Sequence, residues 1–246
     1  MTLWSLCGLN SEITESNIRN IPHISDLCKP LTFSRCGFLK RQSLNRAENL
    51  AVGKSHVDMS LSEDDILVID GGDIACWCEI ALNAWAMTGR KIGGIFAPGP
   101  WEQMGTGPAF ATAIKMERPN SKVVLITGDG SLGLAPGLTP METAIDQGIA
   151  ITLIVANNAQ WGMIQEQQKE MWGRIYGSSL RDVDYYKIFD AAGAYSQLVT
   201  SPAEITDALN LAWQRNQPAF IEVKTSSVPS PMTQGLVEMR VKTAIE

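Results

Sequence analysis

From residue 61 onward, short apolar runs rich in Val and Ile alternate with segments that have the composition and period of helices. The clearest runs are residues 122–127 (KVVLIT), 151–156 (ITLIVA) and 219–224 (AFIEVK). Continuous β-branched runs of this length are typical of strands buried in a parallel sheet. A chain in which strands and helices alternate joins its strands by right-handed crossovers and places helices on both faces. The sequence therefore predicts an α/β fold with a doubly wound parallel sheet.

This regular pattern does not extend over the whole chain of 246 residues. Residues 1–59 scatter Asn, Ser, Pro, Cys and basic residues without sustained periodicity, which predicts an irregular N-terminal extension. Residues 60–225 are predicted to form the folded domain, and residues 226–246 a C-terminal tail. Within the domain, the sequences TPME at 139–142 and SPAE at 201–204 predict helix starts, each with a capping box.

The charge of the chain restricts the ligands it can hold. The formal net charge is −6, so the sequence indicates neither a nucleic-acid partner nor an anionic membrane surface. No apolar run approaches the ~18 residues that a membrane span needs. The odd number of cysteines, five, shows no disulfide pattern, and we therefore expect a cytoplasmic protein. A phosphate ligand would have to be held by backbone amides, helix ends or a metal ion.

Polar residues follow two of the apolar runs at the point where each predicted strand ends. Residues 128–131 (GDGS) follow the first, and residues 157–162 (NNAQWG) follow the next strand along the chain. Consecutive strands are usually neighbours, so the two loops should meet at the carboxyl edge of the sheet, where ligands bind in such folds. Mg²⁺ prefers oxygen ligands and often shares them with phosphates. Asp129 offers a charged oxygen, Asn158 a neutral one, and Gln160 a backbone carbonyl.

The glycines of the first loop suit a phosphate group. Gly130 lets the backbone approach a phosphate closely, and its amide, together with that of Ser131, can donate to the phosphate oxygens. A structural alternative exists, because Asp129 could cap the next turn and Gly130 could only allow that turn. As a set, the two loops favour a magnesium diphosphate site.

The combination of GDGS, NN after the next strand and MGTG upstream resembles the signature of thiamine diphosphate-dependent enzymes. Residues 99–134 resemble the cofactor-diphosphate domain of the acetolactate synthase group, which includes the 2-hydroxyacyl-CoA lyases. The resemblance covers residues 61–225. It implies the thiamine diphosphate-binding fold, with thiamine diphosphate and Mg²⁺ as cofactors.

The resemblance also implies roles for particular residues. Met104 matches the apolar wedge that bends the cofactor, with ordinary core packing as the alternative for this side chain. The backbone carbonyl of Glu102 would receive the aminopyrimidine amino group. The implied metal ligands are Asp129, Asn158 and Gln160. The implied cofactor-binding residues are Gly72, Asp73, Ile74, Glu102, Met104, Gly128, Gly130, Ser131, Gly162 and Met163.

A further implication of the resemblance is that the site is shared. In this enzyme group the glutamate that activates the cofactor comes from a separate pyrimidine-binding domain, which residues 1–60 do not resemble. No catalytic residue is therefore expected in this chain, and its partner would be a pyrimidine-binding domain or subunit in a homo- or hetero-oligomer. The implied function is a thiamine diphosphate- and Mg-binding component of a carbon–carbon lyase, carboligase or 2-keto acid decarboxylase. Its substrates would be small carbonyl or acyl-CoA compounds.

Other interpretations remain. A truncated, non-catalytic homologue could act as a dimerisation or regulatory module; the missing pyrimidine domain favours this, and the intact set of metal ligands opposes it. A dinucleotide-binding domain is less favoured, because no G-x-G-x-x-G opens a helix after the first strand. Four tryptophans could line a substrate pocket or could serve packing, namely Trp77, Trp101, Trp161 and Trp172.

Overall fold

The computed structural model describes residues 61–86, 89, 91–97, 103–134 and 138–237. All of them fall within one compact unit of the chain. The predicted extension, residues 1–59, lies outside the described residues. Among the residues that the structure describes, no helix has the length and apolar character needed to cross a membrane.

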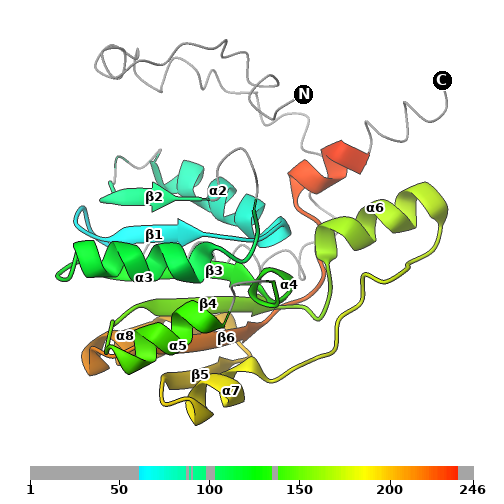
Figure 1. Cartoon of the computed structure of the whole chain (residues 1–246). Helices are drawn as coiled ribbons and strands as arrows, with labels where there is room; N and C mark the ends of the chain where they lie inside the picture. The colour runs from blue at the N-terminus through cyan, green and yellow to red at the C-terminus, as the bar shows by residue number, and fades with distance from the viewer. Residues whose placement is uncertain (1–60, 87–88, 90, 98–102, 135–137, 238–246) are drawn as a thin grey trace. The chain divides into compact units, whose positions relative to one another are not determined.

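The described residues form a six-stranded sheet in the order β2-β1-β3-β4-β6-β5 (Figure 1). Every neighbouring pair in this sheet is parallel. The predicted α/β fold with a parallel sheet is therefore confirmed. The strands are β1 (Ile66–Ile69), β2 (Gly94–Phe96), β3 (Val123–Gly128), β4 (Thr152–Asn157), β5 (Tyr195–Val199) and β6 (Ala219–Lys224).

The order of the strands places a switch point beside β1. After β1 the chain adds β2 on one side of it, and then adds β3 and β4 on the other side. In open parallel sheets of this kind, ligands bind outside the carboxyl ends of the strands at such a switch point. The topology therefore directs attention to the loops that follow β1, β3 and β4.

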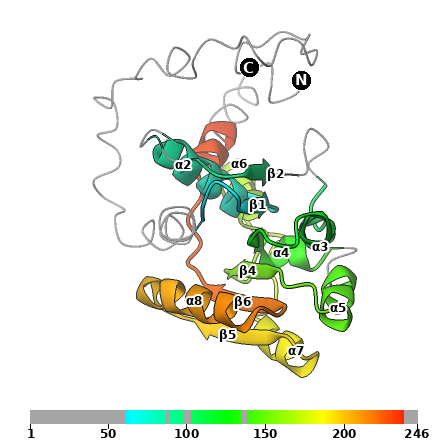
Figure 2. The same cartoon turned by 90° about the vertical axis from the view of Figure 1, so that its left-hand side faces the viewer.

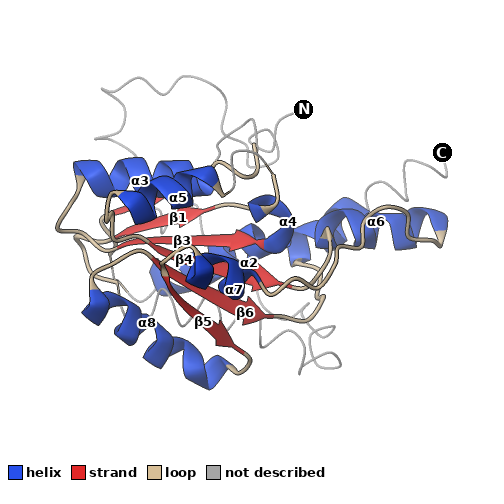
Figure 3. Ribbon diagram, turned by 60° about the horizontal axis from the view of Figure 1, so that its bottom comes forward, coloured by secondary structure: helices blue, strands red, loops and turns tan. Residues whose placement is uncertain are grey.

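Helices cover both faces of the sheet (Figures 2 and 3). Alternate residues of β1, β3, β4 and β6 enter two separate hydrophobic clusters, as strand geometry requires. Val124 and Ile126 pack with α2 and α8, whereas Val123 and Leu125 pack with α3, α5 and α7. The helices are α2 (Asp73–Ala86), α3 (Gly107–Glu117), α4 (Asp129–Leu132), α5 (Thr139–Asp146), α6 (Gly162–Trp172), α7 (Tyr185–Ala191) and α8 (Ile205–Arg215), with a 3₁₀ turn η6 (Pro202–Glu204).

The predicted capping box at residues 139–142 is wrong. Leu138 already has a helical backbone, with φ −76° and ψ −35°, and its carbonyl accepts from the amides of Met141 and Glu142. Thr139 therefore lies inside the first turn, where its side chain cannot cap the helix. The sequence TPME contains the right residue types, but the helix begins one residue earlier than those types suggest.

The second predicted helix start, at residues 201–204, is confirmed in a modified form. The Ser201 hydroxyl oxygen accepts from the amide of Ala203, and the Glu204 carboxylate accepts from the amide of Thr200. The first turn is the 3₁₀ turn η6, and α8 follows it directly. The cap therefore forms. The carboxylate of Glu204, however, accepts from the amide of Thr200 and not from that of Ser201, as a standard capping box would have it.

Candidate functional site

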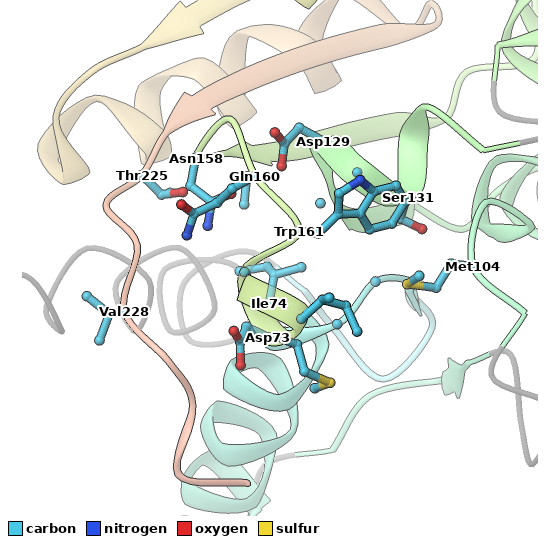
Figure 4. A pocket seen from close by; sticks show the side chains of 18 residues that line it. Asp73, Ile74, Met104, Asp129, Ser131, Asn158, Gln160, Trp161, Thr225 and Val228 are labelled. Atoms are coloured by element: carbon cyan, nitrogen blue, oxygen red, sulfur yellow. The ribbon is translucent and has the colours of Figure 1, made fainter. Parts of the chain in front are cut away.

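One pocket lies at the carboxyl ends of β1, β3 and β4 (Figure 4). It gathers every predicted site residue that the structure describes, although these residues come from distant parts of the sequence. Glu102 lies outside the described residues. The predicted residues that line the pocket are Gly72, Asp73, Ile74, Met104, Gly128, Asp129, Gly130, Ser131, Asn158, Gln160, Gly162 and Met163.

Asp129 carries the unusual electrostatics of this pocket. It is the first residue of the single turn α4 and is only 3% exposed. Its Oδ2 atom is buried without a hydrogen-bond partner among the described residues. Burial raises the pKa of the Asp129 carboxyl to about 6, opposed by backbone hydrogen bonds from Gly130, Asp129 itself, Asn158 and Gln160. A buried carboxylate oxygen that faces a pocket without a donor fits a bound cation.

The other two predicted metal ligands lie in the turn after β4, near Asp129 (Figure 4). The side-chain amide of Gln160 donates to the Ser227 hydroxyl, which leaves its backbone carbonyl as the predicted ligand. No group of three or more His, Cys, Asp or Glu side chains that could hold a metal occurs in the described part of the chain. A metal ion held by Asp129 would therefore depend on amide, carbonyl and ligand oxygens beside that carboxylate, as Mg²⁺ sites on phosphates often do.

Gly130 packs directly under the indole ring of Trp161. A Cβ atom added to Gly130 would lie 3.0 Å from Cε3 of Trp161. Trp161 also lines the pocket (Figure 4); a role of this tryptophan in a substrate pocket stays a prediction. The close approach of the ring leaves little room for a side chain at position 130 and so favours glycine there. The sequence pattern did not reveal this reason.

The loop that carries Met104 is anchored by Asp70, which sequence patterns did not single out. Asp70 is fully buried just after β1. Its Oδ2 accepts from the amides of Gly105, at 2.9 Å, and Gly107, at 2.8 Å. Its Oδ1 accepts from the hydroxyl of Ser131 at 2.6 Å. One carboxylate thus holds the Met104 loop and the α4 turn at fixed positions beside the pocket.

The start of α2 holds the chain that follows β6. The Oδ1 atom of Asp73 accepts from the amide of Ser230 and the hydroxyl of Thr233, and both of these partners are fully buried. Thr225 and Val228 line the pocket as a result. Val228, in the segment predicted only as a tail, therefore contributes to the lining of the pocket.

Of the other tryptophans that had been considered, Trp77 and Trp172 do not line this pocket. Trp77 is buried and donates its indole N–H to the carbonyl of Val228, so it packs under the wall of the pocket. Trp172, at the end of α6, is 63% exposed. Trp101 lies outside the described residues.

The pocket is shallow for a ligand of the predicted size. Its volume is about 110 Å³, below the roughly 300 Å³ at which sites that enclose a drug-sized ligand begin. The described residues therefore enclose only part of such a ligand.

Comparison with known proteins confirms the resemblance. The family model for the C-terminal TPP binding domain of thiamine pyrophosphate enzymes matches residues 73–223; thiamine pyrophosphate is another name for thiamine diphosphate. A probable acetolactate synthase of Mycobacterium bovis is 30% identical over 178 residues, which are 72% of this chain and 31% of that protein. A 2-hydroxyacyl-CoA lyase 2 of Danio rerio is 32% identical over 143 residues, which are 58% of this chain and 22% of that protein.

A solved structure shares the fold. The thiamine diphosphate-dependent 4-hydroxybenzoylformate decarboxylase of Rhodococcus jostii superposes with a TM-score of 0.62 at 20% identity, covering 74% of this chain and 33% of that one. The chain spans about a third or less of the length of each of these proteins. By its sequence match and its fold, the chain belongs to the thiamine pyrophosphate enzyme family, as a C-terminal TPP binding domain.

Proposed function

We propose that this domain binds thiamine diphosphate through a Mg²⁺ ion and supplies the diphosphate half of an active site that makes or breaks a carbon–carbon bond. The observation that carries the proposal is the Oδ2 atom of Asp129. This atom is buried at the pocket without a hydrogen-bond partner among the described residues. A metal ion would satisfy it, and would supply the positive charge that a chain of net charge −6 lacks.

In this proposal three residues hold the metal. Asp129 contributes its free carboxylate oxygen, Asn158 its side-chain oxygen and Gln160 its backbone carbonyl. Mg²⁺ takes six oxygens in a near-octahedral array, so two diphosphate oxygens and a water would complete the shell. Bound thiamine diphosphate supplies carbanion chemistry beside a carbonyl, and the protein contributes position and electrostatics.

The diphosphate would lie against the starts of two helices. α2 begins at Asp73 and α6 begins at Gly162, and both first turns line the pocket. Helix N-termini present free amides and a partial positive charge, and therefore bind phosphate. The amides of Gly130, Ser131 and Met163 are the remaining proposed donors. Met104, in the loop anchored by Asp70, is the proposed wedge against the cofactor.

We also propose that a pyrimidine-binding domain or subunit completes the site. The small volume of the pocket supports this, because the described residues enclose only part of a ligand of that size. The coverage of the relatives supports it too, since the matched region is about a third or less of their length. The glutamate that activates the cofactor would come from that partner, in a homo- or hetero-oligomer. No residue of this chain is proposed as catalytic.

The names of the relatives support the proposed substrate class. They are an acetolactate synthase and a 2-hydroxyacyl-CoA lyase. These names support small carbonyl or acyl-CoA compounds as the proposed substrates. A non-catalytic role in dimerisation or regulation would not require a carboxylate oxygen kept free in the pocket. Metal-dependent cofactor binding gives that oxygen a partner.

Calorimetric titration with thiamine diphosphate tests the proposal. We expect binding in the presence of Mg²⁺, none in EDTA, and at least tenfold weaker binding in Asp129→Asn. Asp65→Asn is the matched control, because Asp65 is also a buried carboxylate but lies before β1, at the opposite edge of the sheet. Binding that occurs only after a pyrimidine-domain polypeptide is added would support the shared site. Absence of binding under both conditions would contradict the proposal.

A further inference from the structure

The turn between the proposed metal ligands has a strained backbone. Ala159, which separates Asn158 from Gln160, has φ 55°. A non-glycine residue in this left-handed region is strained and persists only where its surroundings fix it. The hydrogen bonds around Ala159 therefore indicate what determines the direction of both neighbouring ligands.

Two sets of hydrogen bonds fix this turn. The chain after α6 folds back beside it, so that the amide of Leu180 donates to the carbonyl of Ala159 at 2.8 Å and the amide of Trp161 donates to the carbonyl of Ser178 at 2.9 Å. From the other side, the amide of Ala159 donates to Oδ1 of Asn157 at 3.1 Å. Asn157 is the last residue of β4 and only 2% exposed.

The side chain of Asn157 can face Ala159 in only one orientation. Its Nδ2 donates to Oε1 of Glu222 at 2.7 Å and to the carbonyl of Val183 at 3.0 Å. A side-chain amide has two N–H donors, so both are used by acceptors. A flipped amide would place its oxygen against the Glu222 carboxylate and a donor against the amide of Ala159. The contacts of Asn157 therefore keep Oδ1 directed at the turn.

Glu222 is in turn held by groups other than Asn157. It lies in β6, is fully buried, and its Oε2 accepts from the amide of Tyr186 at 2.9 Å. Lys224 pairs with its Oε1 at 2.8 Å. A buried carboxylate satisfied on both oxygens is a rigid reference point. It links β6 to the turn at the pocket through the side chain of Asn157.

We infer that Glu222 and Asn157 are positioning residues that aim Asn158 and Gln160 at the metal. Glu222 orients Asn157, Asn157 fixes the left-handed turn at Ala159, and the turn directs the Asn158 side chain and the Gln160 carbonyl into the pocket. This inference rests on the proposed function for the identity of the ligand. The hydrogen-bonded chain from Glu222 to Ala159 does not depend on it.

Metal affinity tests the inference. We expect Asn157→Ala and Glu222→Gln to weaken Mg²⁺ binding, titrated in saturating thiamine diphosphate, by ten- to hundredfold, as outer-shell partners of metal ligands do. Asp65→Asn is again the matched control, because its buried carboxylate accepts from the amides of Ser62 and Lys122 and from the Ser62 hydroxyl, away from the turn. This control should lose stability but keep its Mg²⁺ affinity within twofold. A loss of affinity as large in the control would overturn the positioning role.

Amide hydrogen exchange separates this inference from the proposed function. In the ligand-free chain, we expect the amide of Ala159 to exchange at least tenfold faster in Asn157→Ala and in Glu222→Gln, but not in Asp65→Asn. Unchanged exchange at Ala159 would overturn the inference whether or not a cofactor binds. If the wild-type chain bound neither Mg²⁺ nor thiamine diphosphate, with or without a pyrimidine domain, the proposed function would fail. Hydrogen exchange at the amide of Ala159 would then decide the role of Glu222 and Asn157 by itself.

Discussion

The hydroxyl of Ser131 donates a 2.6 Å hydrogen bond to the carboxylate of Asp70, although the two residues lie 61 positions apart in the sequence. The same hydroxyl oxygen accepts from the amide of Gly105 at 2.9 Å. Three segments are joined at this point: the end of β1, the loop that carries Met104, and the turn α4. The wall of the pocket therefore depends on one buried carboxylate that does not itself line it.

Asp70→Asn should destabilise the domain strongly. One of its two acceptor oxygens becomes an NH₂ group that must face a hydrogen-bond donor, namely Gly105, Gly107 or Ser131. Leaving buried donors unsatisfied costs about 1–3 kcal/mol each, so we expect a loss of about 2–4 kcal/mol. Urea unfolding measures this, with Ser131→Ala as the milder comparison at about 1 kcal/mol. An Asp70→Asn protein within 0.5 kcal/mol of the wild type would contradict the anchoring role.

Gly130→Ala should disturb the pocket through a steric contact alone. The added methyl group would lie 3.0 Å from the Trp161 ring, so the ring or α4 must shift. Gly133→Ala is the matched control, because Gly133 ends the same turn with helical φ −72° and ψ −11° and its nearest contact would be an ordinary 3.5 Å. We expect changed tryptophan emission and a loss of about 1–3 kcal/mol for Gly130→Ala, with neither in the control. Equal effects in both variants would refute the steric explanation.

The stability of the ligand-free domain should fall as Asp129 ionises. Burial raises the pKa of its carboxyl to about 6, above about 3.9 in an unfolded chain. Between about pH 4 and pH 6 the folded state keeps a proton that the unfolded state has released, so the stabilisation is present below about pH 4 and lost as the pH rises through about 6. The full effect is on the order of 3 kcal/mol.

Subtracting the free energy of unfolding of Asp129→Asn from that of the wild type, across pH 4 to 7.5, isolates this group from the other carboxylates. We expect the wild type to lose stability relative to Asp129→Asn as the pH rises across that range. Saturating Mg²⁺ and thiamine diphosphate should reverse the shift at pH 7, because the metal binds the ionised carboxylate. A difference that does not change with pH would mean that Asp129 has no raised pKa.

The sequence was sufficient for the sheet and for the residues around the pocket. Runs such as residues 151–156 are clear signals because a strand buried on both faces is mostly apolar along its whole length. The residues of the two loops after β3 and β4 could be brought together in advance because the carboxyl ends of consecutive parallel strands meet. The other predicted site residues were implied by the family resemblance. Their roles in binding a metal or a cofactor remain predictions.

The supporting contacts could not be predicted, because they depend on distances between segments far apart in the chain. Asp70 directly follows β1 and Glu222 lies in β6; both are buried and look like errors in an apolar pattern. Only the fold shows that each carboxylate meets several donors there. Gly130 is similar, since its closest neighbour, Trp161, follows the next strand. The predicted N-cap, Thr139, was wrong by one residue, because sequence patterns do not locate the end of a helix to a single residue.

Anomalous diffraction from crystals grown with thiamine diphosphate and Mn²⁺, a substitute for Mg²⁺ with similar ligand preferences, tests the central claim most directly. We predict one anomalous peak at about 2.1 Å from three oxygens, the typical distance for a small divalent ion. These are Oδ2 of Asp129, the side-chain oxygen of Asn158 and the backbone carbonyl oxygen of Gln160. A peak elsewhere, or cofactor density in the pocket with no metal beside Asp129, would contradict the proposed site.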